Sequence, residues 1–309
     1  MQPRHTRRVT ATLWLLLASV VAVAAQEKPP AADDSLKFAI IGDSGTGSSS
    51  QYRVAEKLVA SRSTFPYEFV LMMGDNLYGS ENASAYEKKF ERPYKPLLDG
   101  GVKFYASLGN HDEPNQRFYK PFNMNGDRYY TFKPKGNVRI FALDSNYVDK
   151  MQLEWFEKEL KASGSDWKVV FFHHPVYSSG GRHGSDEMLR AQLEPLFLKY
   201  GVDAVFQGHE HFYERIKPQK GIYYFISGGA AKLREGNIQK SDLTAKAFDT
   251  GYHFMLIELT KDKLNFQAIS DLGKVIDSGS LPRLGDEQKK AFAGEAALPA
   301  PKPTATTGR

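Results

Sequence analysis

The chain has 309 residues, of which 41% are hydrophobic and 25% are charged, so its composition is that of an ordinary globular protein. This composition excludes a disordered, collagen-like or multi-pass membrane protein. The chain contains no cysteine, which excludes disulfides, zinc fingers, iron–sulfur clusters and thiol nucleophiles. Any metal ion would therefore be held by histidine, carboxylate, amide or phenol groups.

The first 25 residues are typical of a secretory signal peptide. Arg4, Arg7 and Arg8 precede an apolar run at 11–25 that ends in small residues and is short for a stable membrane span. An uncleaved anchor is the alternative. Removing these three arginines from 41 basic residues, against 36 acidic ones, leaves a net charge of +2 rather than +5. We therefore expect a secreted or periplasmic protein with no nucleic-acid partner and no stable membrane span after cleavage.

After a polar linker at 26–35, the body of the chain at 36–284 alternates predicted strands with predicted helices. Apolar runs that end at glycine or polar clusters predict buried strands at 37–41, 69–73, 104–108, 169–172 and 204–206. Helical periodicity is found at 51–61, 152–162 and 186–200. Antiparallel strands are expected at 254–259, 264–270 and 274–277. The pattern predicts one α/β domain, followed by a disordered tail at 285–309.

Side chains that can bind metal ions follow the ends of the predicted strands. They are Asp43, Asp75, Tyr78, Asn110, His111, His173, His209 and His211. Each one alone is equally well explained as a turn or capping residue. However, five of the 8 histidines lie at or just after a strand end, counting His183 on the loop after His173. Because parallel strands gather their carboxyl ends at one edge of a sheet, the set predicts a metal site there.

Five short blocks carry a resemblance to a known family. The blocks are Gly42-Asp43-Ser44-Gly45, Gly74-Asp75-Asn76-Leu77-Tyr78, Gly109-Asn110-His111-Asp112, His173-His174-Pro175 and Gly208-His209-Glu210-His211. In order and approximate spacing, over roughly residues 36–277, they resemble the calcineurin-like metallophosphoesterases. Gly45 stands where most of that superfamily carries histidine, and Tyr78 follows the second aspartate by three places, an exchange similar to the purple acid phosphatases. The resemblance implies a layered α/β sandwich with two central mixed β-sheets flanked by helices.

The resemblance also implies a binuclear metal centre. In it, Fe(III) would be held by Asp43, Tyr78 and His211, a divalent iron, zinc or manganese ion by Asn110, His173 and His209, and both ions by a bridging Asp75. This partition agrees with donor chemistry, because a ferric ion prefers anionic oxygen and a divalent ion suits imidazole and amide groups. His111 and His183 are similar in position to histidines that bind phosphate or donate a proton. The alternative for His111 is a supporting pair with Asp112.

The expected function is that of a secreted acid phosphatase that hydrolyses phosphomonoesters through attack of a metal-bound hydroxide. A phosphodiesterase or nucleotidase of the same superfamily is one alternative, and a non-catalytic iron- or phosphate-binding protein is another. The chain resembles the small, single-domain, tartrate-resistant type, and a monomer is expected. Mammalian members of that type carry a long activation loop, whereas here only Ser145 to Met151 separate a strand from the next helix. No proteolytic activation is therefore expected.

Overall fold

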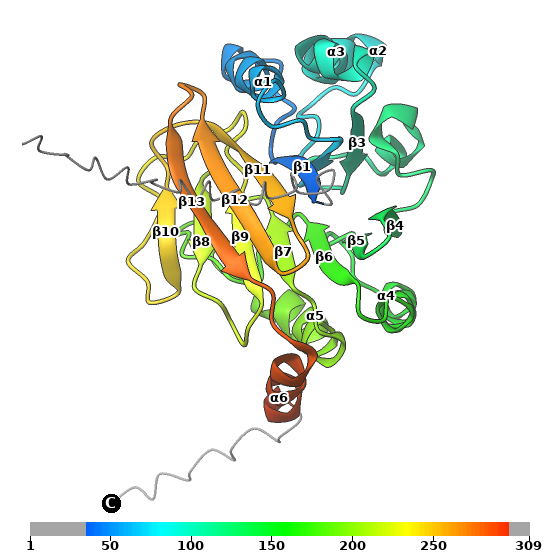
Figure 1. Ribbon diagram of the computed structural model, residues 1–309. Helices are drawn as coiled ribbons and strands as arrows, with labels where there is room; N and C mark the ends of the chain where they lie inside the picture. Colours follow the sequence, from blue (N-terminus) through cyan, green and yellow to red (C-terminus); the bar gives the residue numbers. More distant parts are fainter. Residues whose placement is uncertain (1–34, 297–309) are drawn as a thin grey trace, which may run out of the picture. The chain divides into compact units, whose positions relative to one another are not determined.

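In the computed structural model, which describes residues 35–296, the chain forms two β-sheets with helices on their outer faces (Figure 1). The expected signal peptide at 1–25 and the linker up to residue 34 lie outside the described residues. The expected sandwich of two mixed sheets is confirmed. None of the helices that the structure describes has the length and apolar character needed to cross a bilayer.

The first sheet has six strands in the order β13-β12-β11-β1-β2-β3. They are β1 (Leu36–Ile41), β2 (Phe69–Met72), β3 (Lys103–Ala106), β11 (His253–Leu259), β12 (Lys263–Ser270) and β13 (Val275–Pro282). β1, β2 and β3 are parallel, and their runs of apolar residues are largely buried, as expected for strands covered on both faces. The last three strands form antiparallel pairs that join the sheet where β11 meets β1.

The second sheet has seven strands in the order β10-β8-β9-β7-β6-β5-β4. They are β4 (Tyr130–Lys135), β5 (Val138–Ala142), β6 (Trp167–Phe172), β7 (Ala204–Gln207), β8 (Tyr213–Ile216), β9 (Tyr223–Ser227) and β10 (Thr244–Phe248). Its centre, β5-β6-β7-β9, is parallel, whereas β4, β8 and β10 are antiparallel to their neighbours. The carboxyl ends of β6 and β7 are therefore on one edge of this sheet.

Aromatic and aliphatic side chains fill the space between the sheets. The ring of Phe38 on β1 meets the ring of Phe206 on β7 edge to face at 6.3 Å, and Phe206 stacks on Phe225 of β9 at 5.2 Å. Alternate residues of the same strands point the other way, so Ala39 and Ile41 belong to a separate cluster under the helices. This period of two fixes which face of each strand meets the opposite sheet.

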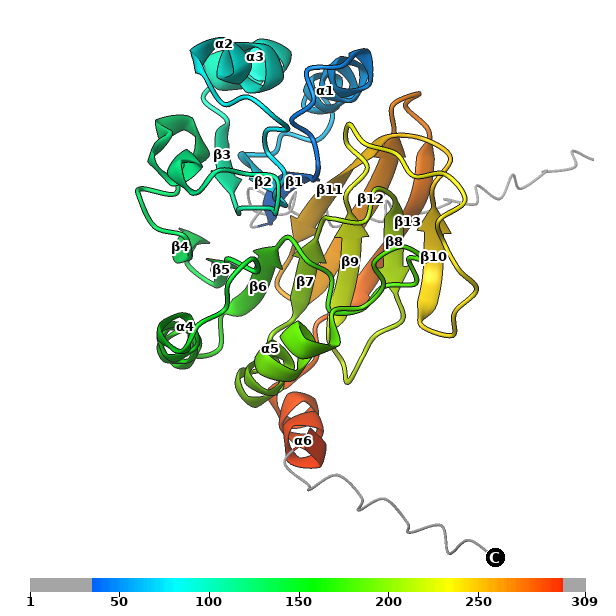
Figure 2. The same cartoon turned by 180° about the vertical axis from the view of Figure 1, so that it is seen from behind.

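The helices form two groups, one on the outer face of each sheet (Figures 1 and 2). The first sheet is covered by α1 (Ser49–Ser61), α2 (Ala83–Tyr86), the π-helical η1 (Glu87–Glu91), α3 (Arg92–Asp99) and the 3-10 turns η2 (Pro114–Phe118) and η3 (Lys120–Phe122). The second sheet is covered by α4 (Lys150–Ala162) and α5 (Glu187–Tyr200). Asp149 and Asp186 cap α4 and α5, which begin within two residues of the predicted starts.

A final helix, α6 (Asp286–Ala296), corrects part of the expected disordered tail. It packs against α5, and Phe292 contacts the core under that helix. Lys289 of α6 donates hydrogen bonds to the backbone oxygen of Gly201 at 3.0 Å and to the buried carboxylate of Asp203. The lysine and alanine content that indicated a tail is also favourable for a helix, and Phe292 and Lys289 fix this helix against the domain. Residues 297–309 lie outside the described residues.

Candidate metal centre

The candidate site lies at the carboxyl ends of the parallel strands of both sheets. Asp43 and Asp75 follow β1 and β2 after one or two residues, and His173 and His209 follow β6 and β7. Asp43, Asp75 and His209 have left-handed backbone conformations, with φ of 56°, 52° and 67°. Such angles are uncommon outside glycine and cost free energy, so three side chains are turned into the site at the expense of local backbone strain.

Three of the expected ligands meet on one side of the site. The phenol oxygen of Tyr78 lies 3.1 Å from Asp43 Oδ1 and 3.4 Å from His211 Nε2. His211 Nε2 is also 3.3 Å from Asp43 Oδ1. These atoms come from the loops after β1, β2 and β7, and their mutual distances are those of donors that surround one cation.

The other expected ligands meet around His173, whose side chain is fully buried. His173 Nε2 lies 3.1 Å from Asn110 Oδ1, 3.1 Å from His209 Nδ1 and 3.5 Å from Asp75 Oδ1. One donor atom each from Asp43, Asp75 and His173 lies within 4.8 Å of the others, so Asp75 stands between the two groups. The structure therefore brings all of the residues expected as ligands to one place.

The electrostatics of the site fit a set of groups that surrounds cations. Burial raises the pKa of Asp43, and the charge of Asp75 adds to this shift. Burial, followed by the charges of Asp43 and Asp75, raises the pKa of Tyr78. Burial lowers the pKa of His209 to about 2 and that of His211 to about 4. The imidazoles are therefore neutral, with lone pairs available to bind a cation, and bound cations would offset the repulsion between the crowded acidic groups.

Glycine residues allow the backbone to approach these carboxylates closely. A Cβ atom at Gly109 would lie 2.2 Å from Asp75 Oδ1. One at Gly208 or Gly228 would lie 2.7 Å from Asp43 Oδ2. Both distances are too short for any side chain, so the backbone encloses the two carboxylates on these sides.

Hydrogen bonds outside the centre fix the orientation of the candidate ligands. His173 Nδ1 is 2.8 Å from the backbone oxygen of Met73, which leaves Nε2 free to bind a cation. Asp112 accepts hydrogen bonds from the backbone nitrogens of Gly109 at 2.8 Å and Leu77 at 3.0 Å. It thereby ties the loop of Asn110 to the loop of Tyr78. Burial, followed by the charge of Asp75, raises the pKa of Asp112 to about 7.

His111 and His183, the expected phosphate-binding or proton-donating residues, lie at the exposed rim of the site. His111 donates its backbone N–H to Asp75 Oδ1 at 3.0 Å, and its ring lies 5.0 Å from the ring of Tyr78. His183 Nδ1 lies 3.0 Å from His209 Nε2. Both rings therefore adjoin candidate ligands, one on each side of the centre.

Glu210 holds the loop of His183 in place. Its fully buried carboxylate accepts hydrogen bonds from the backbone nitrogen of Gly184 at 3.0 Å and from Asn237 Nδ2 at 3.0 Å, and it pairs with Arg234 at 3.3 Å. The loop of His183 and the loop of Asn237 also bond directly, because the backbone nitrogen of Gly181 donates to the backbone oxygen of Asn237 at 2.7 Å. The position of the His183 loop is thus fixed both by Glu210 and by this backbone hydrogen bond.

The sequence interpretation missed three side chains beside the centre. His174, to which the block His173-His174-Pro175 assigns no role, has its ring 4.5 Å from that of His209 and its Nδ1 2.9 Å from Ser145 Oγ. Lys232 Nζ lies 4.3 Å from the ring centroid of Tyr78. Arg234 lies next to His211 and contributes, after burial, to the lowered pKa of His211. Lys232 and Arg234 belong to an irregular loop after β9, where no motif marks them.

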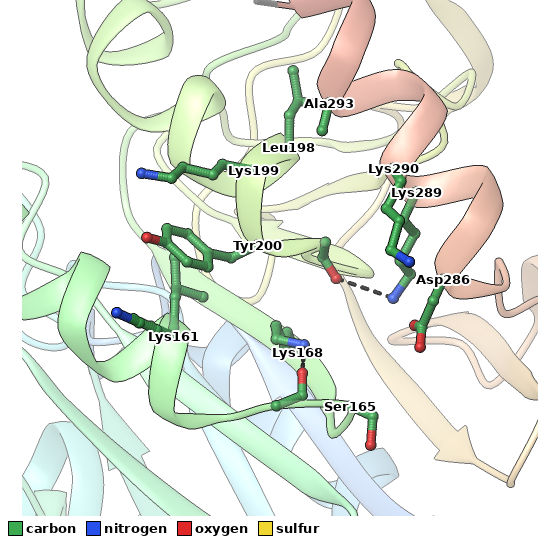
Figure 3. Close-up of a pocket in the computed structure, with 13 residues that line it drawn as sticks. Lys161, Ser165, Lys168, Leu198, Lys199, Tyr200, Asp286, Lys289, Lys290 and Ala293 are labelled. Carbon is green, nitrogen blue, oxygen red and sulfur yellow. Dashed lines mark hydrogen bonds between the residues drawn. The ribbon is translucent and has the colours of Figure 1, made fainter.

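A separate cavity of about 270 Å³ lies between the turn after α4, the end of α5 and α6 (Figure 3). Its lining includes Lys161, Lys168, Lys199, Lys289 and Lys290. Lys168 Nζ donates a hydrogen bond to the backbone oxygen of Gly164 at 2.6 Å, and Lys289 Nζ pairs with Asp203 at 2.5 Å. These two lysines hold the turn and α6 in place. None of the expected site residues lines this cavity, so the strand-end cluster is the candidate site.

Comparison with known proteins agrees with this geometry. The family model of the calcineurin-like phosphoesterases matches residues 36–213, which is more than half of the chain. The chain therefore belongs to the calcineurin-like phosphoesterase family. Within it, purple acid phosphatase 7 of Arabidopsis thaliana is 28% identical over 81% of this chain and 87% of its own length. The human tartrate-resistant acid phosphatase type 5 is 25% identical over 88% of this chain and 98% of its own length.

Solved structures show the same fold. A purple acid phosphatase from yellow lupin seeds superposes with a TM-score of 0.68 at 18% identity, over 83% of this chain and 55% of that one. GAP50, described as the anchor in the inner membrane complex of Plasmodium, superposes with a TM-score of 0.71 at 20% identity, over 86% and 95%. The resemblance to the purple acid phosphatases is confirmed, and so is the prediction of a metal-dependent phosphoric monoester hydrolase, since the relatives are named acid phosphatases.

Proposed function

We propose that this protein is an exported acid phosphatase with a binuclear metal centre. The observation that carries the proposal is the convergence of carboxylate, phenol, amide and imidazole groups around Asp75, with successive donor atoms 3.1 to 3.5 Å apart. In the proposed centre Fe(III) would be held by Asp43, Tyr78 and His211, and a divalent iron, zinc or manganese ion by Asn110, His173 and His209, and Asp75 would be available to both ions.

The donor types support this division. Asp43 would offer an anionic oxygen to the ferric side, as would Tyr78 once a ferric ion displaced its phenol proton, whereas the other side offers two imidazoles and a neutral amide. When bound, the two ions supply Lewis acidity toward phosphate oxygens and make a water acidic enough to act as the nucleophile. The chain itself fixes the donors, because Asp75 is held by the backbone N–H of His111 and His173 by the carbonyl of Met73.

The rim histidines are proposed to act on the substrate directly. His111 and His183 are exposed and adjoin the centre, so either could bind a phosphate oxygen or protonate the departing alcohol. Arg182 and Arg234 add positive charge beside His183, and Lys232 adds it beside Tyr78 and His211. An anionic phosphate ester would be attracted to this side, and a guanidinium there could bind two of its oxygens.

An N-terminal signal at 1–25 would direct the protein out of the cytoplasm, and its homologues include the human tartrate-resistant acid phosphatase type 5. We propose that residues 36–284 make up the catalytic domain and that the enzyme acts as a monomer on phosphate esters. Sedimentation of the purified protein would test the monomeric state, and N-terminal sequencing of the mature chain would test cleavage of the signal.

Steady-state assays test the proposed activity. The full mature protein should hydrolyse nitrophenyl phosphate in acid at least about 10-fold faster, by kcat/KM, than bis(nitrophenyl) phosphate. His111→Ala should lower kcat without loss of the metal ions, since His111 offers only its backbone to Asp75. Preference for the diester would favour a phosphodiesterase. Tight binding of phosphate without turnover would instead indicate a non-catalytic binding protein.

A further inference from the structure

A cavity of about 480 Å³ opens directly beside the candidate metal centre. Asn110 and His174 line one part of it, and the loop between β5 and α4 lines another through Asp144, Asn146 and Tyr147. Because Asn110 is also a proposed ligand, the cavity and the centre are continuous. If a phosphate group occupies the centre, the alcohol part of the same ester has this cavity next to it.

The walls of the cavity are fixed by hydrogen bonds. Asn146 Nδ2 donates to the backbone oxygens of Gly109 at 3.2 Å and Leu108 at 3.3 Å. Ser145 Oγ accepts a hydrogen bond from the backbone nitrogen of His174 at 3.0 Å and lies 2.9 Å from its Nδ1. The short loop after β5 is thereby joined both to the loop of Asn110 and to the end of β6. A preformed wall of this kind lowers the entropy lost on binding a ligand.

The charge in this cavity is already compensated. Its cationic side chain, Arg128, pairs with Asp144 at 3.0 Å and with Asp149 at 3.3 Å. Asp144 is buried, and its Oδ1 accepts the backbone N–H of Asn146 at 3.0 Å. A second phosphate group would therefore find no free cation among the charged residues that line the cavity, and a neutral group fits it better.

Tyr147 gives the cavity an aromatic wall. Its side chain is 64% exposed, although its backbone is held by Gln152, which donates to its carbonyl oxygen at 3.2 Å. The Arg128 guanidinium lies 5.8 Å from the centroid of the Tyr147 ring. A large ring that is anchored at its backbone but exposed to solvent is free to stack on a second ring.

We propose that this cavity binds the alcohol part of the phosphate ester and that Tyr147 makes it selective for alcohols that carry an aromatic ring. The inference rests on the proposed phosphatase function and adds the class of substrate. The aromatic ring of the substrate packs against Tyr147 while its phosphate group lies at the metal centre. Tyr147 is here a specificity-determining residue, and it takes no part in the proton transfers.

Two primary-alkyl phosphates test the proposal without a difference in leaving-group chemistry. The ratio of kcat/KM for 2-phenylethyl phosphate to that for ethyl phosphate measures the benefit of the ring alone. Tyr147→Ala should lower this ratio about 3- to 10-fold. Tyr147→Phe should preserve it, because the ring and not the hydroxyl makes the contact. Phe118→Ala is the matched control. Like Tyr147, Phe118 is an exposed ring beside an arginine: it is 62% exposed, and the Arg117 guanidinium lies 4.6 Å from its ring centroid. Phe118 does not line the cavity.

The outcomes separate this inference from the proposed function. An unchanged ratio in Tyr147→Ala, or an equal fall in Phe118→Ala, would overturn the inference while leaving the phosphatase intact. If neither these esters nor nitrophenyl phosphate were hydrolysed, the proposed function would fail. The cavity would then still be tested by calorimetry with the metal-loaded protein, comparing 2-phenylethylphosphonate with ethylphosphonate. Tighter binding of the phenyl compound that is lost in Tyr147→Ala supports the inference, and equal affinities overturn it.

Discussion

Two sides of the candidate metal centre differ in chemistry. The side formed by the loops after β6 and β9 carries His183, Lys232 and Arg234, so it is rich in groups that attract anions. The side formed by the loops after β3 and β5 carries the cavity with Tyr147, where Arg128 is neutralised by two aspartates. Under the two proposals, most of the positive charge that attracts the phosphate comes from the loops after β6 and β9, whereas the ring that contacts the alcohol comes from the loop after β5. His111, a second candidate for binding phosphate, is on the loop after β3.

On each side a different side chain holds two loops together by hydrogen bonds. Glu210 ties the loop of His183 to the loop of Arg234, and Asn146 ties the loop of Tyr147 to the loop of Asn110. Because Glu210 and Asn146 bind different loops, a change on one side should leave the other side's function in place. Substitutions at the shared centre should instead affect both sides together.

The largest effect is expected at the shared centre. Asp75→Ala removes the carboxylate that stands between the two groups of ligands, so we expect loss of metal and a fall in kcat of at least about a thousandfold. Metal analysis and steady-state kinetics on the same preparation measure both. Asp262→Ala, at an exposed turn, is the control and should behave as the wild type. Normal turnover by metal-depleted Asp75→Ala would contradict the assignment.

A smaller effect is expected at the brace of the anion-attracting side. Glu210→Ala removes the acceptor for Gly184 and the partner of Arg234, so the loop of His183 loses its position. We expect kcat to fall about 10- to 100-fold. Glu210→Gln keeps an oxygen for Gly184 and should recover part of the loss. The phenylethyl-to-ethyl ratio should stay constant in both variants, and a changed ratio would show that the two sides are not independent.

Lys232→Met sharpens the comparison further. Lys232 lies over the ring of Tyr78, so its removal should weaken inhibition by inorganic phosphate about 3- to 10-fold and shift the tyrosinate-to-iron absorption band to longer wavelength. Lys240→Met, an exposed lysine of the same loop, is the matched control. Inhibition constants and visible spectra of both variants provide the test, and identical values in the two would remove Lys232 from the site.

The smallest effect is expected from proteolysis on the aromatic side. The loop between β5 and α4 runs only from Leu143 to Asp149, and it is held by Gln152 and Asn146 as a wall of the cavity. Intact and protease-nicked protein should therefore have the same or, if the wall is cut, slightly lower activity. A large gain in activity on nicking would mean that this loop blocks the site.

The sequence predicted the part of this site that rests on buried parallel strands. Continuous apolar runs that stop at Asp43, Asp75 and His173 define where each strand ends, and sheet geometry brings those ends together. Lys232 and Tyr147 could not be assigned in this way. They belong to irregular loops, whose position depends on contacts between residues far apart in the sequence, such as that of Asn146 with Gly109. Helix α6 was missed because its docking depends on Phe292 and on a partner that is distant in sequence, Asp203.

The most direct test of the central claim is the metal content of the freshly purified protein together with its visible absorption spectrum, for the wild type and Tyr78→Phe. We expect two metal ions for each wild-type chain, one of them iron, with a visible band that disappears in Tyr78→Phe. A wild-type protein that binds fewer than two ions after reconstitution, or a band that is unchanged in Tyr78→Phe, would contradict the proposed centre.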